Sequence, residues 1–135
     1  MQLDEALESM DIEKVISLLH EDFELEMLGT VLKGKEGARK GFNWLLEHVD
    51  GIRLEPVVIM VEDDVFFEEF VVDATLKNGV RIRSKQAEVL IYRDYKVTSL
   101  RLYFDRLDFA DSIARGPIER KIVDILKKRS LQGLT

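Results

Sequence analysis

The sequence contains no cysteine, which excludes disulfides, thiolate metal ligands, iron–sulfur clusters and a cysteine nucleophile. Proline is scarce, with two residues, and no linker rich in proline and glycine divides the chain. No segment approaches the ~20 consecutive apolar residues that a membrane span needs. The N-terminal stretch "MQLDEALESM" also lacks the basic and apolar regions of a signal peptide. We therefore expect a folded, cytoplasmic protein that does not enter a membrane.

Basic residues are outnumbered by acidic ones, 20 against 26, and the formal net charge is −6. Nucleic-acid binding requires a clustered basic surface, so this balance argues against a nucleic-acid partner. Glu, Lys and Arg are nevertheless abundant, as they are in thermophile proteins. With 135 residues, the chain is long enough for one hydrophobic core and too short for two large domains.

Apolar residues at helical spacing predict two short helices at the start of the chain, over residues 3–10 and 12–19. Asp11 lies between them and is a good N-cap for the second. Apolar and acidic residues then alternate over residues 23–27, which predicts a half-buried strand. Helical spacing returns over residues 35–49. The first third of the chain therefore supplies mostly helices.

Four longer strands are predicted in the remainder of the chain, and Asn78-Gly79 between two of them predicts a two-residue type I′ turn. A last amphipathic helix begins at Gly116-Pro117. Helices followed by an antiparallel meander indicate the α+β class, with the helices on one face of the sheet. The four predicted strands are residues 52–61, 65–77, 80–92 and 96–106.

Three segments together resemble the SnoaL-like branch of the nuclear transport factor 2-like superfamily. They are "ALESMDIEKVISLLHEDFELEM", "GKEGARKGF" and "YRDYKVTSLRLYFDRLDF". The resemblance implies a strongly bent, mixed or antiparallel sheet that forms a cone around the N-terminal helices. It implies a cone domain over residues 1–112 and a C-terminal helical extension over residues 113–135. Tyr95 replaces the usual glycine of the family, so this residue is expected to need a positive φ.

The strand register decides which side chains face the inside of the cone. A two-residue turn at Asn78-Gly79 pairs Asp73 with Ser84 and Glu69 with Glu88. Following the family, we assign one face of the sheet to the interior and the other to a homodimer interface. The predicted interior face comprises Phe67, Glu69, Val71, Asp73, Ser84, Gln86, Glu88, Leu90, Leu100, Leu102 and Phe104.

Carboxylates inside an apolar cone are the expected catalytic groups, because burial raises the pKa of a carboxyl group toward neutrality. We predict Asp73 and Glu88 as catalytic residues, although either could instead form an ion pair or lie near the rim. Asp73 matches an aspartate of limonene-epoxide-hydrolase-like relatives. The partner positions are Val71 and Leu102, so epoxide hydrolysis is not expected. The predicted ligand-binding residues are Leu25, Met27, Glu69, Val71, Ser84, Gln86, Leu100, Leu102 and Phe104.

No cofactor motif and no group of metal-ligating residues stands out; His20 and His48 lie near the ends of two different predicted helices. We therefore expect neither a cofactor nor a metal. Two functions remain. The first is a cone that binds a small hydrophobic ligand, including a cofactor-free lyase, isomerase or cyclase that acts through carboxylates. The second is a non-catalytic, dimeric interaction module that uses the sheet face and the C-terminal helix.

Overall fold

The computed structural model describes residues 2–135, which form two compact units. The first unit ends at Phe104, and the second spans Asp105–Thr135. No helix within residues 2–135 is both long and apolar enough to cross a membrane.

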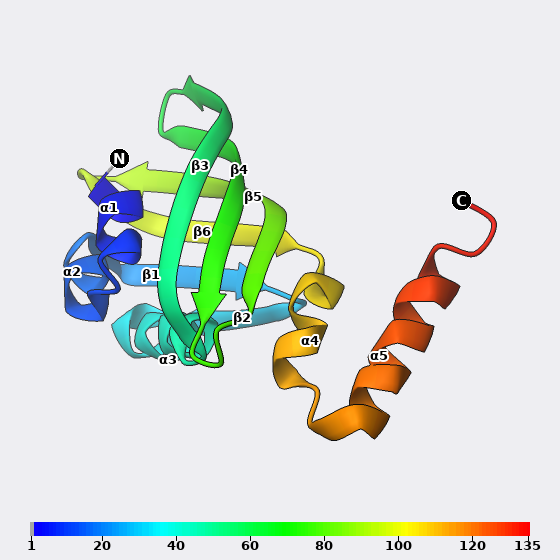
Figure 1. The fold of residues 1–135 in the computed structure, drawn as a ribbon. Helices are drawn as coiled ribbons and strands as arrows, with labels where there is room; N and C mark the ends of the chain where they lie inside the picture. The colour runs from blue at the N-terminus through cyan, green and yellow to red at the C-terminus, as the bar shows by residue number, and fades with distance from the viewer. Residues whose placement is uncertain (1) are drawn as a thin grey trace. The chain divides into compact units, whose positions relative to one another are not determined.

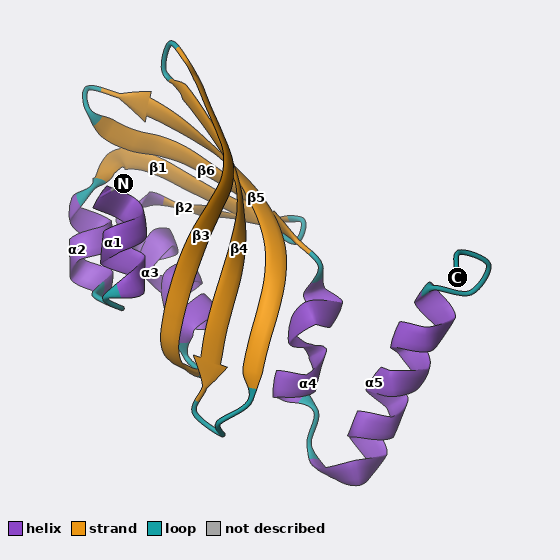
Figure 2. Cartoon of the chain, turned by 45° about the horizontal axis from the view of Figure 1, so that its top comes forward, coloured by secondary structure: helices purple, strands orange, loops and turns teal. Residues whose placement is uncertain are grey.

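Three helices belong to the first unit: α1 (Gln2–Glu8), α2 (Ile12–Ser17) and α3 (Gly34–Leu46). Each was predicted from apolar spacing. Asp11 caps α2 as expected, since its carboxylate accepts a hydrogen bond from the backbone N–H of Lys14 at 3.1 Å. All three helices lie on the concave side of the sheet (Figure 2).

Six strands form one curled, mixed sheet in the order β2-β1-β6-β5-β4-β3 (Figure 1). Neighbours pair antiparallel except β1 and β6, which pair parallel. Strand β2 was not predicted, because four residues are too few to show a period of two. The strands are β1 (Leu19–Met27), β2 (Thr30–Lys33), β3 (Val49–Glu62), β4 (Val65–Leu76), β5 (Arg81–Arg93) and β6 (Lys96–Phe104).

The hydrophobic core lies between the three helices and the concave face of the sheet. Helix α3 packs so tightly on β1 that a Cβ added to Gly41 would lie 2.4 Å from Leu25 Cδ2. This part of the interior is therefore filled by side chains. The buried core residues are Leu3, Ala6, Val15, Ile16, Leu19, Phe23, Leu25, Met27, Ala38, Phe42, Leu90, Val97 and Leu100.

The predicted pairing of β4 with β5 is wrong by one residue. Asp73 lies opposite Arg83, and Glu88 lies opposite Glu68 instead of Glu69. Side chains alternate between the faces of a strand, so this shift moves every β4 residue to the face opposite the predicted one.

The turn between β4 and β5 explains the error. Leu76 and Val80 close a three-residue loop, with a 2.8 Å hydrogen bond from the N–H of Leu76 to the carbonyl of Val80. Gly79 has a φ of +86°, but Asn78 is not among the residues with positive φ, so the turn is not type I′. The loop is one residue longer than predicted, and the register shifts accordingly.

The predicted faces of β5 and β6 are correct. A three-residue loop over residues 93–95 predicts Leu100 beside Glu88, whereas Leu100 pairs with Leu90 and Leu102 pairs with Glu88, which is a shift of two residues. An even shift leaves every side chain on its predicted face. The intervening turn confirms the expectation for Tyr95, whose φ is +64°, beside Asp94 at +52°.

The second unit contains a short 3-10 helix η1 (Arg106–Phe109), α4 (Ala110–Ile113) and α5 (Gly116–Ser130). Asp105 caps η1, because its carboxylate accepts a hydrogen bond from the N–H of Leu107 at 2.9 Å. Lys127 Nζ on α5 donates to Asp111 Oδ2 on α4 at 2.7 Å. Within this unit, the apolar stripe of α5 is exposed, and it comprises Ile118, Ile122, Ile125 and Leu126.

Candidate functional site

Three carboxyl groups from different elements converge on the concave side of the sheet. Asp4 comes from α1, Glu68 from β4 and Glu88 from β5, and each contributes an oxygen within 4.8 Å of the others. Glu68 and Glu88 are directly opposite in the register, which places their side chains on the same face. We call Asp4, Glu68 and Glu88 the carboxylate cluster.

The two glutamates of the cluster are almost completely removed from solvent. Glu68 is 1% exposed and Glu88 is 4% exposed, whereas Asp4 is half-buried. Neither carboxylate oxygen of Glu68 accepts a hydrogen bond from any N–H or hydroxyl group of residues 2–135. An unpaired buried carboxylate is costly, so a proton or a cation must compensate the charge of this cluster.

Burial and mutual repulsion shift the titration of the cluster. Burial, followed by the charges of Asp4 and Glu68, raises the pKa of Glu88 from 4.5 to about 8. Burial is also the largest cause that raises the pKa of Glu68, and the charge of Asp4 adds to it. The pKa of Asp4 is raised mainly by burial. All three groups therefore hold a proton more readily than ordinary carboxylic acids do.

Glu88 and Glu68 form a pair that shares one proton. The contact raises the pKa of Glu88 and opposes the rise for Glu68, and the two groups titrate as one coupled pair. When Glu88 carries the proton, its carboxyl group donates to the carboxylate of Glu68, which otherwise has no donor. Near neutral pH the pair offers one acid and one base side by side.

Apolar side chains surround the cluster on the same face of the sheet. Leu90 is fully buried, and Phe66 and Tyr92 pack partly buried against the core. Burial raises the pKa of Tyr92, as do the nearby charges of Glu88 and Asp4, so its phenol stays protonated. On β3, Ile59 lies opposite Glu68 and is 51% exposed. An exposed apolar surface therefore borders the buried carboxylates.

Two of the predicted polar ligand-binding residues continue the row of Glu88 along β5. Ser84 is 1% exposed and Gln86 is 9% exposed. The Nε2 group of Gln86 lies 3.3 Å from Ser84 Oγ, and donates to it. The structure thus brings Ser84, Gln86 and Glu88 together on the concave face.

The predicted catalytic Asp73 lies on the convex face, away from Glu88. Its carboxylate forms an ion pair with Arg83, with Nη1 to Oδ2 at 3.0 Å. Glu69 is exposed on the same convex face, and Val71 is buried there. The expectation that Glu69 and Asp73 face inward was wrong for the reason given above, which is the extra residue in the β4–β5 turn.

Apart from Val71, the predicted apolar ligand-binding residues belong to the core or pack against it. Leu25, Met27 and Leu100 are buried members of it, and Leu102 and Phe104 pack partly buried against it. Leu102 also lies opposite Glu88 on β6, and so borders the carboxylate cluster.

Sequence reasoning missed Asp4 and Glu68. The stretch "FFEEF" places one glutamate on each face of β4, and only the turn length decides which faces inward. Asp4 lies on a helix whose apolar spacing indicates burial, but spacing alone does not show which strand the helix crosses. A predicted three-residue turn with glycine at its last position would have given the correct register, in which Glu68 faces inward.

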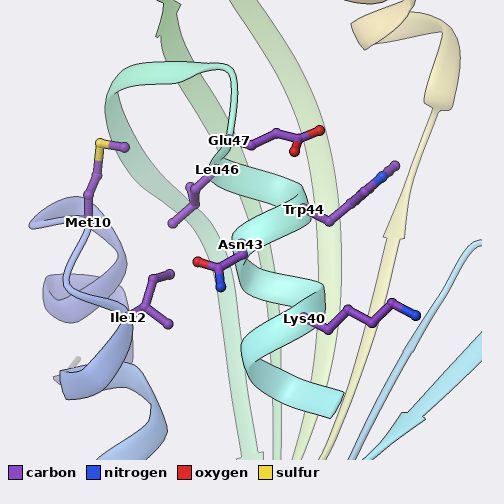
Figure 3. Close-up of a pocket in the computed structure, with 7 residues that line it drawn as sticks. All are labelled: Met10, Ile12, Lys40, Asn43, Trp44, Leu46 and Glu47. Carbon is purple, nitrogen blue, oxygen red and sulfur yellow. The ribbon is translucent and has the colours of Figure 1, made fainter. Parts of the chain in front are cut away.

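A depression of about 640 Å³ lies on the outside of the first unit, between α3 and the start of α2. In Figure 3, Asn43 and Leu46 point toward Met10 and Ile12, whereas Trp44 points away from them. None of the three cluster carboxylates lines this depression, and Trp44 is 52% exposed. The buried ionisable groups identify the concave face, not this depression, as the candidate site.

Comparison with solved structures agrees with a curled sheet that packs against helices. A hypothetical protein from Catenulispora acidiphila with a ketosteroid-isomerase-like fold, crystallised with trimethylamine, is 14% identical, with a TM-score of 0.72 over 82% of this chain and 87% of that one. An NTF2-like protein of unknown function from Burkholderia pseudomallei is 17% identical, with a TM-score of 0.74 over 84% and 93%. An LEH-like epoxide hydrolase from M. tuberculosis is 20% identical, with a TM-score of 0.68 over 90% of each chain.

These similarities show that the chain has an NTF2-like α+β fold. Residues 2–100 match the model of the SnoaL-like domain, and the chain belongs to that family. A search of curated proteins found no match. The resemblance inferred from the sequence is confirmed.

Proposed function

We propose that the protein binds a small, largely apolar molecule at the carboxylate cluster and transfers a proton to or from it through Glu88 and Glu68. The observation that carries this proposal is the buried pair itself, in which the pKa of Glu88 is raised to about 8 while Glu68 remains the base. General acid–base catalysis is most efficient when the pKa of the catalytic group is near the working pH.

Each residue has a defined part in this reaction. Glu88, in its protonated form, donates a proton to an oxygen or carbon of the ligand. Glu68, which has no other donor, accepts a proton from a second position of the ligand. The half-buried carboxylate of Asp4 closes the cluster from α1. This chemistry suits an isomerase, lyase or cyclase that needs no cofactor. Neighbours of the same fold support it, including an LEH-like epoxide hydrolase and an epoxide hydrolase/cyclase-like enzyme.

Solvent deuterium incorporation tests the proposal without knowledge of the natural substrate. The protein is incubated with 4-methylcyclohexanone in D₂O, and loss of the α-protons is followed by NMR. We expect incorporation above the buffer rate, and a loss of about tenfold or more in Glu88→Gln. Asp73→Asn is the matched control, because Asp73 lies on the convex face, and its rate should equal that of the wild type. Equal rates for Glu88→Gln and the wild type would contradict the proposal.

A homodimer through the convex face of the sheet is a further part of the proposal. Val65, Phe67, Val89 and Ile91 form an apolar strip on that face, where Phe67 lies opposite Val89 and Val65 opposite Ile91. Val65 is 42% exposed, and the other three are partly exposed. A contiguous apolar surface of this kind supports association with a second copy.

A further inference from the structure

The charge balance of the carboxylate cluster restricts the ligands that can bind there. Three carboxyl groups lie within 4.8 Å of one another, and the pair formed by Glu68 and Glu88 shares a single proton. No lysine, arginine or histidine of residues 2–135 forms a hydrogen bond or ion pair with Asp4, Glu68 or Glu88. The charge of the α-amino group opposes the rise that burial causes in the pKa of Asp4 and of Glu68 and so offsets part of this negative charge, which leaves at least one negative charge without a partner among residues 2–135.

Glu68 gives independent support for an external partner. It is 1% exposed, and apart from the proton shared with Glu88 its carboxylate oxygens have no donor among residues 2–135. A buried carboxylate with free acceptor sites destabilises the fold unless a donor reaches it. A ligand that carries both positive charge and N–H donors would satisfy both needs of Glu68.

The surroundings distinguish an organic cation from a bare metal ion. Calcium and magnesium surround themselves with six or more oxygens, supplied by carboxylates, carbonyl groups and water. Here the neighbours of Glu68 on β3 and toward the start of β4 are apolar, namely Ile59, Val61 and Phe66, and Gln86 is the polar neighbour of Glu88 on β5. Ile59 is 51% and Val61 is 65% exposed, so apolar surface remains for a ligand to cover.

Resting on the proposed function, we infer that the ligand of this site is a small protonated amine with an apolar body. The ammonium group lies between Asp4 and Glu68 and donates to both carboxylates. The apolar body covers Ile59, Val61 and Phe66. Protonated Glu88 then donates its proton to an atom of the apolar body.

Binding of a matched pair of probes tests this inference. Cyclohexylammonium and cyclohexanol have the same ring, and an aliphatic amine is protonated at neutral pH. Their affinities are measured by protein-observed NMR titration at pH 7. We expect cyclohexylammonium to bind about tenfold or more tightly than cyclohexanol, because a hydrogen bond to a charged group stabilises a complex more than one between neutral groups. Shifts should centre on Ile59, Val61 and Phe66.

Two isosteric variants test whether the preference for cyclohexylammonium over cyclohexanol depends on Glu68. Glu68→Gln should reduce the ratio of the two affinities to about threefold or less, because the amide carries no charge. Glu69→Gln changes the adjacent glutamate on the convex face and should leave the ratio unchanged. Both variants keep the size of the side chain, and circular dichroism confirms that they fold.

Each alternative outcome has a defined meaning. Equal binding of the two probes would overturn the amine inference, while deuterium incorporation into 4-methylcyclohexanone would still support the proposed function. Binding of Mg²⁺ or Ca²⁺ that Glu68→Gln abolishes, without binding of cyclohexylammonium, would also overturn it in favour of a metal site. Absence of probe binding together with absence of deuterium incorporation would contradict both.

Discussion

Glu68 and Glu69 are adjacent in the sequence and identical in chemistry, yet their environments are opposite. Glu68 is 1% exposed within the carboxylate cluster, and Glu69 is exposed on the convex face. The pair therefore provides a matched comparison at the scale of single residues. A change at Glu68 should affect titration and ligand binding, and the same change at Glu69 should affect neither.

The raised pKa of Glu88 predicts that stability falls as the pH rises. In the folded protein Glu88 keeps its proton up to about pH 8, whereas in the unfolded chain it loses the proton near 4.5. Between these values the folded state binds more protons, so the free energy of unfolding decreases with pH, by up to about 1.4 kcal/mol per pH unit for one proton. The contribution is complete below pH 4.5 and lost above about 8.

Urea denaturation between pH 5 and 9 measures this slope. Asp4 on α1 and Glu68 on β4 contribute in the same direction, because their pKa values are also raised. Glu88→Gln should flatten the slope over this range, and Glu69→Gln should leave it unchanged. A wild-type protein whose unfolding free energy rises from pH 5 to pH 8 would contradict the assignment.

Tyr95 allows a second test at the residue scale. It has a φ of +64° and a fully exposed side chain, so the left-handed conformation has no compensating contact. Tyr95→Gly should raise the free energy of unfolding by about 1 kcal/mol, since glycine adopts this conformation without a steric penalty. Tyr95→Ala is the control and should give little or no gain. Thermal denaturation of the three proteins checks the order.

At the scale of elements, the packing of α3 against β1 depends on a glycine. A Cβ at Gly41 would lie 2.4 Å from Leu25 Cδ2 and 3.0 Å from Leu32 Cδ1. Gly41→Ala should therefore destabilise the fold by about 1–3 kcal/mol through overpacking. Gly51→Ala is the matched control, because nothing lies within 4 Å of its added Cβ. Equal stability of the two variants would show that α3 shifts without cost.

Periodicity predicted most of the elements, and the order of the elements carried the family resemblance. Helices α1, α2 and α3 and strands β3 to β6 follow from apolar spacing, and Asp11 marks the start of α2. The faces of β5 and β6 were also correct, because the register error was an even number of residues there.

The composition of the site depended on a detail that periodicity does not contain. One extra residue in the turn before Val80 exchanged Asp73 for Glu68 on the concave face. To predict that Asp4 belongs to the site, one must know where α1 crosses the sheet, and that depends on the packing of residues far apart in the sequence. Glu88 could be predicted, whereas its two partners could not.

At the scale of the whole molecule, the core of the first unit is contained in the segment from Leu3 to Leu100. A protein truncated after Phe104 should therefore fold and unfold cooperatively, with the pH-dependent slope of the full chain. Circular dichroism and urea denaturation check this expectation. A truncated protein that fails to fold would show that residues 105–135 are part of the stabilising structure of the cone.

The apolar strip on the convex face predicts a dimer at the same scale. The chain has a mass of 15.6 kDa, and sedimentation velocity should give twice that mass for the wild type. Ile91→Asp should shift the equilibrium to the monomer, because a charge in an apolar interface is costly. Lys85→Asp, on the same face outside the strip, is the control. A wild-type monomer at micromolar concentration would contradict the dimer.

The central claim is that Glu88 holds a proton at neutral pH because it is buried beside Glu68 and Asp4. The most direct measurement is a ¹³C NMR titration of the glutamate side-chain carboxyl groups. The Glu88 signal should titrate near pH 8 in the wild type and lower in Glu68→Gln, which removes the neighbouring charge and the carboxylate acceptor. A Glu88 carboxyl that titrates near 4.5 and does not respond to Glu68→Gln would contradict the account.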